Sequence, residues 1–233
     1  APKAPEVEVP TAPQAAALHM RIASVPLRVS ADASFAREIE RSTKKRLPAT
    51  APLQIVFSGD DEVDDGSLAH RVFRGLAPRA DTQGRVFIGF RTHQTTAFSG
   101  HMAARFIPTV ERESLDLVDR YCARWNIELL AMGAFLARAV YEAELVALGA
   151  RWPDADGAGR ARLHDAALHT MRFFSFRQSS PATRVSATLE DRFFGCCTRP
   201  CISLLSSHGL RASDSVRLPS AMLADFVADI PVV

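Results

Sequence analysis

Short apolar runs in the first half of the chain give way to a long amphipathic stretch in the second. Residues 18–29 alternate as a β-strand does, although Pro26 confines that strand to a sheet edge or ends it. Residues 53–58 form an apolar run typical of a buried strand. Residues 86–90 and 101–107 form two more, which we expect to pair as a hairpin bridged by the Thr-, Ser- and Gly-rich residues 92–100. The first half therefore predicts a small β-sheet.

Apolar residues recur three or four positions apart over residues 117–148, which predicts a long helix with one buried stripe. The stripe comprises Val118, Cys122, Trp125, Leu129, Met132, Leu136 and Val140. Gly149 follows as the expected residue just past the helix end, and Pro153 prevents the helix from resuming.

Shorter elements flank this helix. Residues 34–45 predict a connecting helix, helical spacing returns over residues 160–174, and Pro181 is placed to open another helix. Residues 202–206 indicate a late strand and residues 221–227 a short terminal helix. Together these elements predict an α+β fold, in which a small mixed sheet is packed on one face by the long helix and by further helices.

The domain organisation follows from the same patterns. Residues 1–17 are rich in Pro and Ala and poor in bulky apolar groups, so we expect a flexible linker. Residues 18–150 would form the α+β domain, and residues 151–233 a helical C-terminal extension that ends in a short strand and helix and packs on the same domain. Because the chain begins at Ala1, we expect it to be part of a longer protein.

Composition limits the partners. A formal net charge of +2 lacks the basic excess that binding to a nucleic-acid backbone needs. No apolar run approaches the roughly 18 residues that span a bilayer. Three of the four cysteines, Cys196, Cys197 and Cys201, lie close together in the sequence and do not form a spaced disulfide framework. We therefore expect a reducing, intracellular location, and we favour the cytoplasm over the nucleus.

Two clusters invite a metal interpretation. The acidic turn at residues 59–66 lacks the alternating oxygen ligands and distal glutamate of a calcium loop, so we expect a solvated turn. The Cys-Cys-x-x-x-Cys run with His208 lacks the two spaced pairs of a zinc site, so we expect free thiols. We therefore predict no metal.

Three runs carry a family resemblance: GFRTHQTT at residues 89–96, HMAARFIPTVERES at 101–114 and WNIELL at 125–130. They resemble the segment that follows the ATP-binding domain in a fungal family of large uncharacterised sacsin-like proteins with a histidine-kinase-like ATPase domain. The resemblance implies a transducer or middle domain of the chaperone-type ATPase superfamily. It also implies that ATP and Mg²⁺ belong to an upstream domain of the same polypeptide, with no cofactor in this chain.

The resemblance singles out Arg112 between Glu111 and Glu113. This run is similar to a loop of the ninety-kilodalton heat-shock chaperones whose arginine reaches the ATP site of the preceding domain. Arg112 is therefore a candidate nucleotide sensor, with Glu111 and Glu113 as candidates beside it. In the competing interpretation, the two glutamates cap the following helix and Arg112 pairs with them locally.

The polar loop before it has its own alternatives. His93 and His101 could be metal ligands or an acid–base pair, but no third ligand or nucleophile accompanies them. We favour a hydrogen-bonding surface turn that contacts the nucleotide domain, supported by Arg105 and formed by His93 with Gln94, Thr95 and Thr96.

Three functions remain open at this stage. The leading hypothesis is a non-catalytic module that couples nucleotide state to protein clients. The alternative is an interaction or scaffold domain with no nucleotide role, and a stand-alone enzyme using one of the two histidines is less favoured.

Overall fold

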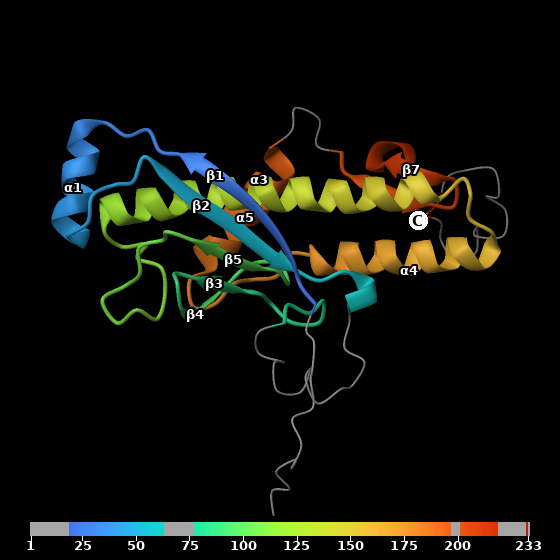
Figure 1. Cartoon of the computed structure of the whole chain (residues 1–233), viewed down its shortest axis with the longest axis horizontal. Helices are drawn as coiled ribbons and strands as arrows, with labels where there is room; N and C mark the ends of the chain where they lie inside the picture. The colour runs from blue at the N-terminus through green and yellow to red at the C-terminus, as the bar shows by residue number, and fades with distance from the viewer. Residues whose placement is uncertain (1–18, 63–76, 197–200, 219–231, 233) are drawn as a thin grey trace, which may run out of the picture.

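A five-stranded sheet and a long helix dominate the computed structural model, which describes residues 19–62, 77–196, 201–218 and 232 (Figure 1). The sheet strands are β1 (Arg21–Arg28), β2 (Thr50–Phe57), β3 (Arg85–Phe87), β4 (Arg91–Thr95) and β5 (His101–Ala104). The helices are α1 (Ala33–Thr43), α3 (Arg120–Arg151), α4 (Gly157–Phe173) and α5 (Thr183–Gly195), followed by the hairpin β6 (Ser203–Ser206) and β7 (Gly209–Ala212). The predicted α+β class is confirmed.

The sheet order is β1-β2-β5-β3-β4, and all neighbours pair antiparallel except β3 and β5. The predicted hairpin between residues 86–90 and 101–107 is therefore wrong in its partners: β3 forms its hairpin with β4 and runs parallel to β5. The reason is that the polar residues RTHQT form strand β4 within the segment predicted to be a loop. After β4 the chain crosses back, and β5 enters between β2 and β3.

One face of the sheet packs on α3, which runs along the length of the molecule, while α4 lies alongside its second half (Figure 1). Alternate β2 residues Leu53 and Ile55 are fully buried there with Met102 and Leu130. The close contact requires Gly133, where an added Cβ would lie 2.5 Å from the Met102 sulfur. Side chains from α4 and α5 join the same hydrophobic cluster, namely Leu163, Ala167, Phe173, Val185, Leu189 and Phe193.

The long helix lies three residues downstream of its predicted bounds. Asp119 is its N-cap and accepts hydrogen bonds from the backbone N–H groups of Tyr121 and Cys122 at 3.0 and 2.9 Å, so Val118 precedes the helix and is 95% exposed. At the other end the helix continues through Gly149, where an added Cβ would lie 2.7 Å from the Leu210 Cβ. That glycine permits close packing of β7 and does not terminate the helix.

Several predicted features fall on residues that the structure does not describe. The linker at 1–17, the terminal helix at 221–227, Cys197 and the second half of the acidic turn lie outside the described residues. Within the described residues, Cys196 and Cys201 are half-buried, and the Cys196 thiol donates to the Phe193 carbonyl at 3.3 Å. Of the helices that the structure describes, none has the length and hydrophobicity needed to cross a bilayer.

The segment before α3 is held by one buried side-chain amide. Asn126 is fully buried, and its Oδ1 accepts a hydrogen bond from the Ile107 N–H at 2.8 Å. Its Nδ2 donates to the carbonyls of Ile107 and Asp116, each at 2.8 Å. Since these two residues flank the loop that carries Arg112, Asn126 fastens both ends of the loop to α3.

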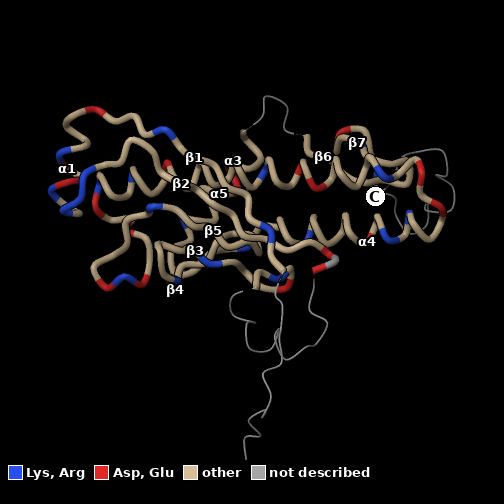
Figure 2. The backbone as a smooth tube through the Cα atoms, in the orientation of Figure 1, with Lys and Arg blue, Asp and Glu red and all other residues tan. Residues whose placement is uncertain are grey.

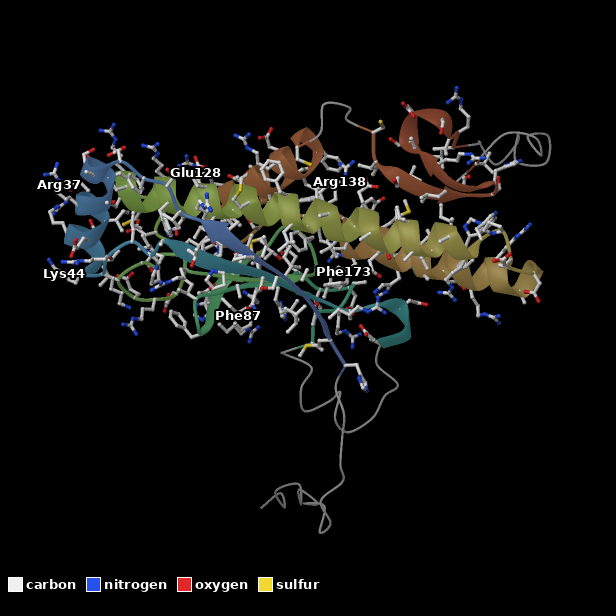
Figure 3. The ribbon with its side chains drawn as sticks, turned by 45° about the horizontal axis from the view of Figure 1, so that its top comes forward. Arg37, Lys44, Phe87, Glu128, Arg138 and Phe173 are labelled. Carbon is white, nitrogen blue, oxygen red and sulfur yellow. The ribbon has the colours of Figure 1, made fainter. Side chains whose placement is uncertain are left out.

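We predict that Asn126→Ala lowers the free energy of unfolding by about 2–4 kcal/mol, because it removes three buried hydrogen bonds and leaves a small cavity. Urea denaturation measures the change. Glu128→Ala, on the exposed side of α3 (Figure 3), is the matched control and should change stability by less than about 0.5 kcal/mol. Equal effects of the two substitutions would contradict the anchoring role.

Candidate functional site

The candidate sensor Arg112 lies at the tip of a narrow loop. Pro108 and Leu115 form an isolated antiparallel bridge at its base, and the Thr109 N–H donates to the Ser114 carbonyl at 2.9 Å. The Arg112 N–H donates to the Thr109 carbonyl at 2.9 Å, and Arg112 takes a left-handed conformation with φ 60°. This conformation costs a non-glycine residue about 1–2 kcal/mol, so the surrounding contacts hold the tip in one shape.

The same loop is fastened to β4. The His93 N–H donates to the Glu113 carbonyl at 2.7 Å, and the Ser114 hydroxyl donates to the Gln94 Oε1 at 3.0 Å. The Glu113 carboxylate also lies 3.9 Å from the His93 Nδ1, with both side chains largely exposed. Glu113 therefore faces β4.

The competing interpretation of Arg112 does not match the geometry. Glu111 and Glu113 are exposed and lie ahead of the N-cap Asp119, so neither caps α3. Among the residues that the structure describes, no carboxylate lies within ion-pair distance of the Arg112 guanidinium. Arg112 thus presents its charge to solvent.

The two histidines of the polar segment have different environments. His93 is exposed on the edge strand β4, whereas His101 is 7% exposed on β5. The His101 Nδ1 accepts a hydrogen bond from the Arg85 N–H at 3.0 Å, and its ring lies 5.3 Å from that of Phe87. In the described part of the chain, no group of three His, Cys, Asp or Glu residues is placed to hold a metal ion.

The rest of the polar segment is buried, which corrects the expected surface turn. Gln94 and Thr96 are 0% exposed and Thr95 is 7% exposed. The Gln94 Nε2 donates to the Ala182 carbonyl at 3.3 Å and its Oε1 accepts from the Ala182 N–H at 3.2 Å, while the Thr95 N–H donates to the Ser180 carbonyl at 2.8 Å. These residues join β4 to the segment before α5.

Thr96 closes the crossing from β4 to β5. Its hydroxyl donates to the carbonyls of Phe98 and Gly100 at 2.6 and 3.0 Å. Gly84 meets this turn so closely that an added Cβ would lie 1.8 Å from the Gly100 oxygen. The turn is therefore part of the scaffold that positions β5.

A groove of about 890 Å³ opens beside the Arg112 loop. Its lining includes four exposed cations, Lys45, Arg46, Arg105 and Arg112, and we call it the basic groove. The loop after α1 and the loop before α3, which carry these charges, lie at the same end of the molecule (Figure 2). The sequence showed Lys45 and Arg46 only as a basic cluster at a helix end, about 60 positions from Arg105, so the groove was missed.

Buried residues form the floor of the basic groove. Trp125 is 8% exposed, and its Nε1 donates to the Arg105 carbonyl at 2.8 Å, so its predicted burial is confirmed. Burial raises the pKa of the neighbouring Cys122 thiol to about 12, with the nearby Asp119 adding to the effect. That thiol stays protonated at neutral pH and is no nucleophile.

The profile of the family described as "Protein of unknown function (DUF3684)" matches residues 1–233. The chain belongs to the DUF3684 family. No curated protein and no solved structure matches it. In this DUF3684 chain the Arg112 loop and the basic groove lie next to each other, since Arg112 belongs to the groove lining.

The contribution of the α3 N-cap Asp119 to stability depends on pH. Hydrogen bonds from the Cys122 N–H, the Cys122 thiol and the Tyr121 N–H hold the pKa of the Asp119 carboxyl below its usual value. A lowered folded-state pKa stabilises the fold above the unfolded pKa of about 3.9, and this contribution is lost as the pH falls through the folded-state pKa.

At about pH 7 we expect Asp119→Ala to lower the free energy of unfolding by about 1 kcal/mol, and Asp119→Asn, which keeps a capping oxygen, to change it less. Urea denaturation at several pH values from about 7 to about 3 should show the wild type losing stability relative to Asp119→Asn at the acid end, because only the carboxylate titrates. If the difference in stability between the wild type and Asp119→Asn stayed constant from about pH 7 to about pH 3, Asp119 would not be the titrating cap.

Proposed function

We propose that this chain is a non-catalytic coupling module of a larger sacsin-like protein with a chaperone-type ATPase domain. In this proposal Arg112 senses the phosphates of a nucleotide that an upstream domain binds, and ATP and Mg²⁺ belong to that domain. The protein would act inside the cell on protein clients. The observation that carries the proposal is an exposed guanidinium, without a carboxylate partner among the described residues, at the tip of a loop anchored at several points.

The anchoring suits a group that must act on another domain. Asn126 fastens both ends of the loop, and hydrogen bonds from His93 and to Gln94 fasten its returning strand. A tip held in this way does not have to be ordered when the partner binds, so less entropy is lost on docking.

The residue type suits a phosphate. A guanidinium is planar and permanently charged, and it can donate two parallel hydrogen bonds to phosphate oxygens. Supplied by a second domain, such a group stabilises charge that develops during phosphoryl transfer and makes hydrolysis depend on domain docking. The left-handed φ of 60° at Arg112 is a local strain that a glycine would avoid, which supports a role for the side chain.

The test compares turnover and nucleotide affinity in the longer protein that includes the upstream domain. We expect Arg112→Ala to lower the rate of ATP hydrolysis by about tenfold to a thousandfold and to change nucleotide affinity much less. The reason is that the guanidinium would stabilise negative charge that develops only in the transition state. Arg112→Lys should not restore turnover, since an ammonium cannot reproduce the planar fork.

Arg112→Gly separates the guanidinium from the backbone strain. Glycine accepts the left-handed conformation, so this variant should melt at or above the wild-type temperature and yet lose turnover as Arg112→Ala does. Arg37→Ala, which removes an exposed arginine on α1 outside this loop, is the matched control and should retain turnover. Unchanged hydrolysis in both Arg112→Ala and Arg112→Gly would end the sensor proposal.

A further inference from the structure

The basic groove carries an excess of positive charge that its own carboxylates do not balance. Asp116 accepts the backbone N–H groups of Val118 and Asp119 at 3.0 Å each, and Asp119 caps α3, so both carboxylates are engaged at the helix start. Of the four cations in the lining, only Arg46 has a carboxylate partner among the described residues, Glu40 at 3.3 Å, and both of those side chains are well exposed. Exposed ion pairs of this kind contribute about 0–1 kcal/mol.

The groove also has apolar residues in its lining. Partly buried Ile88, Ile107 and Leu47 line it, and Phe90 and Val110 stand at its mouth with 36% and 96% of their surfaces exposed. The hairpin tip between β3 and β4 supplies Ile88 and Phe90, whereas the other three apolar residues come from the two segments that carry the cations. A bare phosphate would meet the cations and leave this apolar surface in water.

We propose that the basic groove binds an extended peptide segment in which acidic and apolar residues alternate. Successive side chains of an extended chain point in opposite directions, so one set would enter the apolar floor while the carboxylates face the cations. The volume of about 890 Å³ lies near the upper end of the roughly 300–1,000 Å³ range of small-ligand sites, so several side chains can enter it. Nucleic acid fits less well, because the lining offers a single exposed aromatic ring, Phe90, for base stacking and the chain's net charge is only +2.

Trp125 is a built-in reporter for this groove. The only other tryptophan is Trp152, which caps the far end of α3 and packs against His164 and Arg160. In a Trp152→Phe background, fluorescence changes on ligand addition therefore come from the groove.

The probe is the synthetic peptide acetyl-ELEFELEF-amide, titrated into the whole chain. We expect a saturable change in Trp125 fluorescence. The affinity derived from it should fall by about tenfold or more when NaCl is raised from about 0.05 M to about 0.5 M, since salt screens exposed charges. The serine analogue acetyl-ESESESES-amide should bind at least about tenfold more weakly, because it cannot fill the apolar floor.

Charge reversal at the groove supplies the decisive comparison. Lys45→Glu and Arg105→Glu should each weaken binding of the acidic–apolar peptide by about tenfold. Phe90→Ser should weaken it as well and reduce the difference between the two peptides. The matched control is Arg37→Glu on the outer side of α1, outside the groove lining (Figure 3), which should bind as the wild type does.

Circular dichroism and a melting curve establish that each variant is folded before its affinity is measured. Absence of binding by the folded wild type, or equal binding by all charge variants, overturns the proposal. Tighter binding of ATP or of oligo-deoxythymidine with the same dependence on Lys45 and Arg105 also overturns it, in favour of a phosphate ligand. None of these variants alters Arg112, so the outcome does not decide the nucleotide-sensing proposal.

Discussion

The loop that carries Arg112 depends on the amide of Asn126. A buried amide must find partners for two N–H donors and its oxygen, and an unsatisfied one costs about 1–3 kcal/mol. Asn126 meets this requirement with the backbone of Ile107 and Asp116, where the chain leaves β5 and where it approaches α3. The conformation of the eight residues between them therefore depends on hydrogen bonds from a side chain on α3, outside the loop.

A second buried amide, that of Gln94, joins this loop to the rest of the molecule. It bonds to Ser114 in the loop and to the backbone of Ala182 before α5. Its strand, β4, is an edge of the sheet, and its His93 and Thr95 N–H groups are satisfied by the same two segments. The edge is thereby covered, which removes the exposed donors that invite aggregation.

The two functional proposals follow from the same construction. Because the buried amides hold the loop, Arg112 can remain exposed, and the loop also forms one wall of the basic groove. A phosphate sensor needs one well-placed guanidinium, whereas a peptide groove needs an apolar floor and several charges around it. These requirements fall on different residues, and a coupling module that docks on its partner through an acidic segment would use both.

The sequence by itself determined the α+β class, the long helix with Trp125 in its buried stripe and the short C-terminal strand, because strong periodicity is a local signal. It also led to Arg112, through a resemblance. It did not reveal that β4 is a strand or that Gln94 and Thr96 are buried, since their partners include Ala182, 88 positions from Gln94. Only the tertiary structure brought Lys45 and Arg105 into the lining of one groove, because such proximity arises from packing and not from spacing along the chain.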